Sequence, residues 1–408
     1  MSALDALAID IDPTTYRSFH DSLDEPAVDA TLTPRELEVR ALARDVVARK
    51  VAPRAAAADA GHIFPAEGLR ALCDARLGGL LFPARLGGTG DSNVAYALAM
   101  EEVAAGCPAT SLVFMTQMHG AYPILLAGSE ELKERYIPGL LDGTAYGSLG
   151  ITEPGAGSDV ASISTTATPT DEGWLISGQK TFITTGDRAD VIVCFASVDR
   201  SRGRDAVTAF VLEGDWPGVG HGKPFDKLGM HASSTAELFL ERVPVPRSHL
   251  LGAEGGGWAV VMSSVVKSRI SAAAQGVGIA RAVYARTLAA LIREHGPRLT
   301  DEHTFALADL RGRILQGRLL LHAVARRVDA DPTTSPGQIG IMKQACTDLG
   351  FAAAVEATRI LGPLGDLRAV GVERYLRDAK VTQIYDGTNE IQRLLIGRET
   401  ARTTAALS

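Results

Sequence analysis

The sequence has few aromatic residues, few cysteines and no long apolar run. Only 5% of its 408 residues are aromatic, and four are cysteine. The cysteines lie far apart and form no CxxC pair, so neither a disulfide framework nor a cysteine zinc site is indicated. We interpret them as buried thiols of a protein in a reducing compartment, and we expect no bound metal.

Charge and hydropathy exclude further classes of protein. No stretch of about 18 apolar residues runs without a charge, so we expect no membrane-spanning helix. The first residues are acidic and lack the basic and apolar regions of a secretory signal, which favours a cytoplasmic protein. The net charge of -7 argues against nucleic acid as a partner, because binding to phosphates depends on a cationic surface.

The residues that are abundant indicate a globular protein with close-packed helices. Hydrophobic residues make up 46% of the chain, which is too many for a disordered protein. The length suggests about two to four structural units. Residues 1–31 are polar and acidic, and we expect them to form an N-terminal extension.

The hydrophobic pattern divides the rest of the chain into three parts. Residues 32–145 follow a helical period, with Thr33 placed as an N-cap before Pro34. Residues 146–252 contain β-branched segments bounded by Gly, Asp and Pro, which are typical of strands and turns. Residues 253–408 return to the helical period. Alternating β–α–β units, a GxGxxG fingerprint and a Walker A loop are missing, so a doubly wound nucleotide-binding fold is not expected.

Two segments of the strand-rich part carry polar groups suited to a ligand. In Gly150–Asp159, glycine N–H groups and the hydroxyls of Thr152 and Ser158 could hold a polar planar or anionic ligand. A glycine-rich turn is an equally good interpretation of that segment. Lys180–Gly186 presents hydroxyls beside an aromatic ring, but on its own it is also typical of an ordinary strand.

A third segment, Arg374–Arg393, contains a turn between two helices. Asp386 begins an Asp-Gly-Thr turn, and we expect Asn389 to cap the last helix. A carboxylate beside the ring of Tyr385, between two helices, is partly desolvated and is a candidate general base. Taken alone, however, Asp386 would be interpreted as a plain turn residue.

In this order, and on this background of helices, strands and helices, the three segments resemble the acyl-CoA dehydrogenase family of flavoproteins. The resemblance extends over residues 33–403. The segments that carry it are Thr152–Asp159, Arg377–Lys380 and Ile384–Arg393, together with Phe225–Thr235 and Val243–Pro246 of the middle part.

The resemblance implies a mainly α fold with a central β domain. The expected parts are a helical N-terminal domain, a middle β-barrel-like domain and a C-terminal four-helix bundle. It also implies that FAD lies between the β domain and the bundle, with an acyl thioester against one flavin face. Members of this family build part of each FAD site from a neighbouring subunit, so we expect a homotetramer or homodimer.

The resemblance also assigns expected roles to individual residues. Asp386 matches the catalytic base. The residues expected to bind the cofactor are Leu149, Ile151, Thr152, Gly157, Ser158, Phe182, Thr184, Arg293, Arg359, Thr388 and Glu390. The residues expected to contact the substrate are Ser158, Arg269, Tyr385 and Gly387.

The implied reaction is the α,β-dehydrogenation of an acyl thioester, carried by coenzyme A or by an acyl carrier protein. Asp386 would remove the α-proton, which needs a carboxylate within hydrogen-bond reach. The β-hydride would pass to flavin N5. An electron-transfer flavoprotein, or oxygen, would then reoxidise the flavin.

The sequence departs from the family pattern at the base. The common residue there is Glu, and Asp is shorter by one C–C bond, about 1.5 Å. Some members carry the base before the arginine that Arg269 matches, but Ser268 occupies that position and cannot serve. Asp386 is therefore the base candidate that the resemblance offers.

Further departures concern the pyrophosphate of FAD and one residue of the middle domain. Arg293 stands one place away from the usual arginine, and His295 replaces a phenylalanine. Arg359 occupies the place of a glutamine and is a candidate for the phosphate charge, while Pro363 removes one N–H donor. His231, where the family often has Arg, we interpret as a surface or packing residue.

Two other functions stay open at this point. A flavin-dependent monooxygenase on the same fold would activate oxygen and need no α-proton base. A binding or scaffold protein that has lost FAD would follow from the altered pyrophosphate residues.

Overall fold

The N-terminal part is helical, as its periodicity predicts. The computed structural model describes residues 13–331 and 333–405. Thr33 caps the first long helix: its hydroxyl accepts a hydrogen bond from Glu36 N at 3.2 Å, and the Glu36 carboxylate accepts one from Thr33 N at 2.8 Å. The helices of this part are α3 (Pro34–Val46), α4 (Ala55–Gly61), α5 (Ala66–Asp74), α6 (Asn93–Gly106), α7 (Pro108–Ala127) and α8 (Glu130–Asp142).

Helices α6 and α7 lie at the centre of the molecule. Every residue of α6 is buried, and so is nearly all of α7. Apolar residues are spread around both helices and not confined to one face, which is the pattern of a helix surrounded by other elements. They pack against α9 (Gly257–His295), and α7 also packs against β1 (Gly147–Gly150).

The middle part forms one eight-stranded sheet. The strands follow the order β6-β7-β3-β2-β4-β5-β8, and β1 pairs with β4 in parallel. The β-branched segments of the sequence lie in β3, β4, β5 and β7, so those strands are confirmed. The remaining bounds are β2 (Thr166–Pro169), β3 (Gly173–Thr184), β4 (Val191–Ser197), β5 (Val207–Glu213), β6 (Val219–His221), β7 (Thr235–Pro246) and β8 (Leu250–Leu251).

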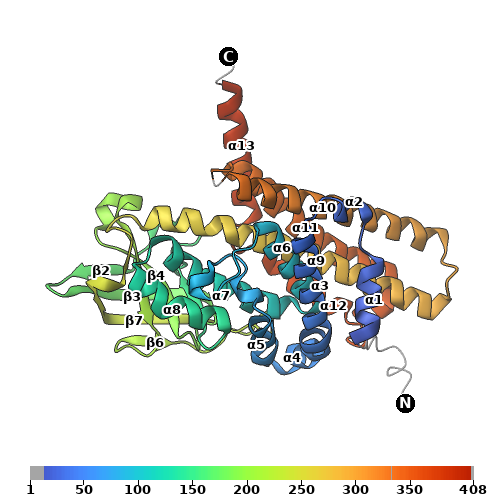
Figure 1. Ribbon diagram of the computed structural model, residues 1–408, viewed down its shortest axis with the longest axis horizontal. Helices are drawn as coiled ribbons and strands as arrows, with labels where there is room; N and C mark the ends of the chain where they lie inside the picture. The colour runs from blue at the N-terminus through green and yellow to red at the C-terminus, as the bar shows by residue number, and fades with distance from the viewer. Residues whose placement is uncertain (1–12, 332, 406–408) are drawn as a thin grey trace.

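The C-terminal part consists mainly of long helices, as its helical period predicts. They are α9, α10 (Asp301–Ala330), α11 (Pro336–Leu361), α12 (Val372–Thr382) and α13 (Asn389–Ala405). Helices α9 to α12 pack on one another, and α11 also packs on the start of α13. Figure 1 shows the sheet at one end of the long axis, the long helices at the other, and α13 projecting away from the body.

The acidic N-terminal segment is helical where the structure describes it. Residues 1–12 of the expected extension lie outside the described residues. The rest forms α1 (Pro13–Ser22) and α2 (Pro26–Asp29), which are attached to α3 by ion pairs. Asp24 pairs with Arg44 at 2.8 Å, and Asp29 pairs with Arg40 at 2.6 Å. Within residues 13–331 and 333–405, no helix combines the length and hydropathy that a membrane crossing requires.

A cluster of buried charges joins the N-terminal helices to the C-terminal ones. Arg281 of α9 contacts Glu101 at 2.7 Å and Glu102 at 2.9 Å, and Arg318 of α10 contacts Glu101 at 2.9 Å. Burial alone would raise the pKa of Glu101, but the guanidinium groups of Arg318 and Arg281 hold it far below its ordinary value. The two carboxylates are thus ionised inside the core and depend on their arginines.

Replacing Arg281 tests this dependence. We expect Arg281→Met to lower the free energy of unfolding by about 3–5 kcal/mol, because it leaves two adjacent buried carboxylates with too little positive charge. Urea denaturation measures the change. The matched control is Arg311→Met: Arg311 pairs with Glu25 at 2.7 Å but its side chain is 50% exposed, so a loss of under about 1 kcal/mol is expected. Equal losses would contradict the account.

Candidate active site at the turn between α12 and α13

The turn that carries Asp386 has an unusual backbone. Asp386 has φ +56° and Gly387 has φ +85°, so two successive residues are left-handed. For a residue other than glycine this conformation costs free energy and is characteristic of functional turns. The expected cap was wrong: the hydroxyl of Thr388, not the Asn389 side chain, accepts from Ile391 N at 3.3 Å. Asn389 is the first residue of α13.

Three side chains from three helices hold the carbonyls of this turn. Arg269 Nε donates to Asp386 O at 3.3 Å. Gly387 O accepts from Lys343 Nζ at 3.1 Å and from Gln392 Nε2 at 2.8 Å. Burial lowers the pKa of Lys343 to about 8, although the Asp386 charge opposes that effect. These bonds fix the backbone of the turn from which the Asp386 side chain projects.

The Asp386 carboxylate is buried and incompletely bonded. Its side chain is 11% exposed, and Oδ2 has no hydrogen-bond partner among the described residues. Its other oxygen, Oδ1, lies 3.9 Å from Nε2 of His119 on α7. A buried carboxylate oxygen without a donor is costly, and such groups are concentrated at functional sites. Oδ2 therefore has free lone pairs for which no described protein group competes.

The hydroxyl of Tyr385, next to the base candidate, is already bonded to protein. It donates to Gln275 Oε1 on α9. Gln275 Nε2 in turn donates to Ser111 Oγ on α7 at 2.9 Å. Burial, and then the neighbouring Asp386 charge, raise the pKa of Tyr385 well above its ordinary value. The ring of Tyr385 thus lies beside the site while its hydroxyl anchors the turn to α9 and α7.

Helix α7 connects this turn to the sheet. Gly147, the first residue of β1, donates its N–H to Gln117 Oε1 at 2.9 Å. The Gly147 carbonyl accepts from the hydroxyl of Thr185, just after β3, at 2.6 Å. The residue after His119 on α7 is Gly120, and a Cβ there would lie 2.9 Å from Gly147 Cα. Helix α7 therefore contacts both the Asp386 turn and the beginning of β1.

The glycine-rich segment is held in place by a residue that the sequence reading did not single out. Glu153 is buried and accepts hydrogen bonds from Lys180 Nζ at 2.7 Å and Thr165 N at 3.0 Å. Burial would raise the pKa of Glu153, but the Lys180 charge and these bonds lower it to about 2. A further bond, from Thr181 N to Thr152 O at 2.9 Å, joins the segment to β3.

The residues expected to contact the flavin in the middle part lie on the glycine-rich segment and on β3, which the bond from Thr181 N to Thr152 O joins. Phe182 is 68% exposed, has φ +56° and lies against Phe225 with ring centroids 5.4 Å apart. The hydroxyls of Thr152, Ser158 and Thr184 form no side-chain hydrogen bond within the part of the chain that the structure describes. An exposed aromatic ring beside unpaired hydroxyls suits a flat ligand with polar edges, such as an isoalloxazine ring. The other residues expected here are Leu149 and Ile151, which are half-buried, and Gly157, which is exposed.

The two arginines expected at the pyrophosphate are not at the Asp386 turn of the same chain. Arg359 lies more than four turns beyond Lys343 on α11, about 24 Å along the axis, and it pairs with Glu356 at 2.7 Å. Arg293 lies in the last turn of α9. Near the Asp386 turn, Glu390 is exposed and Thr388 is half-buried.

His231 packs at a junction of the three parts of the chain, as its interpretation as a packing residue predicts. Its Nδ1 lies 3.2 Å from Asp59 Oδ1, and its ring stacks on His62 at 4.4 Å. Beside it, Asp378 of α12 accepts a hydrogen bond from Met230 N. Burial raises the pKa of Asp378 to about 6. The signature segments around residues 230 and 378 therefore contact each other.

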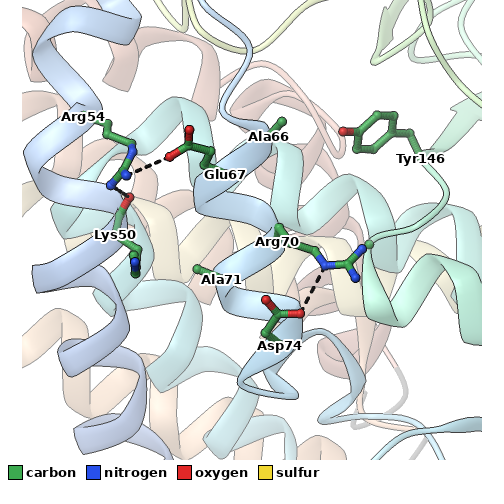
Figure 2. A pocket seen from close by; sticks show the side chains of 9 residues that line it. Lys50, Arg54, Ala66, Glu67, Arg70, Ala71, Asp74 and Tyr146 are labelled. Atoms are coloured by element: carbon green, nitrogen blue, oxygen red, sulfur yellow. Dashed lines mark hydrogen bonds and ion pairs between the residues drawn. The ribbon is translucent and has the colours of Figure 1, made fainter.

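A surface groove of about 510 Å³ lies between α5 and the segment around Lys50 (Figure 2). Four of its five charged residues form two ion pairs: Arg54 with Glu67 at 2.7 Å, and Arg70 with Asp74 at 3.1 Å. None of the residues expected at the active site lines this groove. It is therefore separate from the candidate site.

The acid stability of the protein tests the role of Glu153. Because its folded pKa of about 2 lies below the ordinary 4.5, its contribution to stability is complete above 4.5 and is lost as the pH falls towards 2. We expect Glu153→Gln to cost about 3–5 kcal/mol at pH 7, because Lys180 is left buried and unpaired. The difference from wild type should shrink in acid.

Urea unfolding at a series of pH values measures that difference. Glu134→Gln, which alters an exposed carboxylate, is the control and should follow the wild-type curve. A Glu153→Gln difference that stays constant from neutral to acid pH would show that the Glu153 charge does not hold the segment.

The chain matches the acyl-CoA dehydrogenase family in all three parts: the N-terminal domain over residues 33–144, the middle domain over 148–243 and the C-terminal domain over 255–401. It is 38% identical over 368 residues to cyclohex-1-ene-1-carbonyl-CoA dehydrogenase of Geobacter metallireducens, covering 88% of this chain and 95% of that protein.

Two solved structures are similar over nearly their full length. Butyryl-CoA dehydrogenase from Megasphaera elsdenii has a TM-score of 0.86 and 33% identity, with 91% of this chain and 99% of that chain covered. A chain from a structure described as the electron transferring flavoprotein of Acidaminococcus fermentans, in work on flavin-based electron bifurcation, has a TM-score of 0.87 and 32% identity, with the same coverage.

Proposed function

The chain belongs to the acyl-CoA dehydrogenase family of flavin oxidoreductases acting on CH–CH groups, and on that premise we propose which of its residues carry out the dehydrogenation of an acyl thioester. Asp386 is the base. The observation that carries this assignment is a buried carboxylate oxygen, Oδ2, without a hydrogen-bond partner among the described residues, on a turn whose carbonyls are held by Arg269, Lys343 and Gln392.

FAD is the cofactor, since the family is one of flavoproteins and the face beside Phe182 suits a flavin ring. When bound, FAD accepts the hydride that leaves the β-carbon. The hydroxyls of Thr152, Ser158 and Thr184 are the donors for its polar edge, and the exposed ring of Phe182 covers its apolar surface. Leu149 and Ile151 supply apolar contact, Gly157 permits close approach of the backbone, and Thr388 and Glu390 extend the site toward α13.

Asp386 acts on the substrate by taking the α-proton. The C–H bond breaks, its electron pair stays with the acyl group, and the proton bonds to Oδ2. Arg269, whose guanidinium donates to the Asp386 carbonyl, holds the backbone of the base in place during the transfer. The ring of Tyr385, the backbone of Gly387 and Ser158 of the glycine-rich segment are the other residues proposed to contact the thioester.

The substrate is a coenzyme A thioester of a short or cyclic acyl group. Supporting this are the relatives named for cyclohex-1-ene-1-carbonyl-CoA and butyryl-CoA. The shorter base also favours a compact acyl group, whose α-carbon can approach Asp386 closely. A carrier protein in place of coenzyme A is the alternative that a substrate panel must include.

A second copy of the chain and a redox partner complete the proposal. Arg293 and Arg359 lie away from the Asp386 turn of their own chain, and α13 projects from the body with Leu394 exposed (Figure 1). We therefore propose a homotetramer or homodimer in which these arginines bind the FAD pyrophosphate of a neighbouring subunit. The electron acceptor is an electron-transfer flavoprotein, in line with the similar structure described by that name.

The state of the four cysteines indicates the cellular compartment in which the protein works. All of them are free and buried in the folded chain. Buried free thiols are typical of proteins that work under reducing conditions, which supports a cytoplasmic enzyme.

The role of Asp386 is tested by the anaerobic bleaching of the FAD absorbance with a panel of acyl-CoA and acyl-carrier thioesters. We expect Asp386→Asn to slow bleaching by about 10³-fold or more, because an amide cannot accept the proton. The control is Asp348→Asn, which alters a carboxylate bonded to Asn389 on the outer side of the turn at 2.7 Å. Parental bleaching rates in Asp386→Asn with an active thioester would contradict the assignment.

The role of Arg359 is tested by FAD affinity. We expect Arg359→Met to weaken FAD binding by about 10-fold, because a charged contact to the pyrophosphate is worth about 1.4 kcal/mol or more. Fluorescence titration of the apoprotein with FAD measures it. Arg327→Met, which removes an exposed arginine paired with Asp331 at 3.0 Å on α10, is the control. Equal affinities in both variants would remove Arg359 from the site.

A further inference from the structure

His119 is the one histidine of α7, and it has no partner for its Nε2. Apolar residues are spread around this helix, and the His119 side chain is only 11% exposed. Its Nε2 atom is buried without a hydrogen bond among the described residues, and so is Asp386 Oδ2. The unsatisfied His119 nitrogen therefore lies near the Asp386 carboxylate: Nε2 is 3.9 Å from Oδ1, the oxygen next to the unbonded Oδ2.

The distance between His119 Nε2 and Asp386 Oδ1 is slightly longer than a hydrogen bond. It exceeds the about 2.7–3.2 Å of an N–H···O hydrogen bond, so the two atoms are neighbours without a direct bond. Hydrogen bonds of catalytic groups are often long before a substrate binds and shorten in the complex. Closing the gap requires a movement of the Asp386 side chain, because α7 packs closely on β1 where Gly120 meets Gly147.

We propose that His119 is a positioning residue for the base: its neutral imidazole donates from Nε2 to Asp386 Oδ1 and leaves Oδ2 to receive the α-proton. This role depends on the proposed function of Asp386. The same bond offsets the shorter reach of Asp compared with the usual Glu. A carboxylate bonded to His119 on α7 has one preferred orientation. During the transfer the α-carbon loses a proton to Oδ2, the electron pair stays on the acyl group, and His119 stays neutral throughout.

The charges around the pair are consistent with a neutral donor. Burial lowers the pKa of His119, and the Asp386 charge opposes this only in part. The other titratable groups facing Asp386 are Tyr96 on α6, Arg269 on α9, Lys343 on α11 and the adjacent Tyr385.

Each of these groups is engaged elsewhere. Tyr96 bonds to Ser271 at 2.9 Å, Tyr385 bonds to Gln275, and both tyrosines have raised pKa values, chiefly because they are buried. Arg269 and Lys343 donate to backbone carbonyls of the turn. Among the described residues, His119 is the one basic side chain recorded beside a carboxylate oxygen of Asp386.

The first test compares the FAD-loaded enzyme with two His119 variants and a control. The measured quantity is the anaerobic bleaching rate from about pH 5 to about pH 9, with the thioester that bleaches the wild type fastest. His119→Leu removes the donor, and His119→Gln keeps an N–H donor. Met118→Leu is the control, a volume-conserving change at the preceding core position.

We expect His119→Leu to slow bleaching by about 10- to 100-fold, since a misplacement of about 1 Å has an effect of that order. The acid limb of its pH–rate profile should move up by about one pH unit, because a carboxylate that loses a hydrogen-bond donor binds its proton more tightly. His119→Gln should stay near wild type in both respects. The proposal is overturned if His119→Leu has the rate and pH profile of Met118→Leu.

A second measurement needs no turnover. The NMR signal of ¹³C-labelled His119, assigned from His119→Gln, is titrated in the wild type and in Asp386→Asn. We expect the His119 pKa to be lower in Asp386→Asn, because the carboxylate that favours the imidazolium is gone. Identical titrations would show that the two groups do not interact.

The two tests also separate this proposal from the proposed function. If Asp386→Asn bleaches at the parental rate, or if no thioester bleaches the wild type, the assignment of the base fails whatever His119 does. If Asp386→Asn bleaches slowly while His119→Leu has the bleaching rate and pH profile of Met118→Leu, Asp386 remains the base and the positioning role of His119 is contradicted.

Discussion

The close approach of α7 to β1 is the constraint on which the site depends. Gly120 and Gly147 meet so closely that a Cβ on Gly120 would lie 2.9 Å from Gly147 Cα, and Gln117 bonds to the N–H of Gly147 beside this contact. Because packed interiors yield little to added atoms, α7 cannot shift relative to the sheet. The same helix carries His119, whose Nε2 lies 3.9 Å from Asp386 Oδ1, so α7 contacts both the strand end at Gly147 and the Asp386 turn.

Buried ion pairs stabilise the packing of the helices and strands around that contact. Arg281 binds Glu101 and Glu102 between α9 and α6, and Lys180 binds Glu153 beneath the glycine-rich segment. Removing one partner of such a pair is expensive, so each pair specifies one arrangement of its helices or strands. The reacting groups are thereby held by elements that have little freedom to move, as preorganised catalysis requires.

Much of this fold could be predicted from local patterns, and the limits have physical causes. The long helical pattern of α9 and the apolar, β-branched run of β4 were enough to indicate a helix and a strand. Short strands such as β2 and β8 have no such period and exist because a neighbouring strand pairs with them. The Asp386 turn was predicted because its Asp-Gly pair suits left-handed backbone, and both residues have positive φ.

The residues that support the site could not be predicted from the sequence pattern. Glu153, Lys343 and His119 each stand alone among their sequence neighbours and acquire a role only through partners far along the chain: Lys180, Gly387 and Asp386. A lone histidine in an apolar helix was the single signal for His119, and it does not identify a partner. Conversely, Arg293 and Arg359 were predicted from resemblance, and their place at the far end of the bundle agrees with a site shared between subunits.

The central claim is that Asp386 removes the α-proton of a thioester, and isotope exchange at that carbon tests it most directly. The measurement is the rate at which deuterium from D₂O enters the α-position of a bound acyl thioester, followed by NMR under anaerobic conditions. The account predicts exchange by the wild type and exchange at the background rate by Asp386→Asn. Equal exchange by both proteins would contradict it.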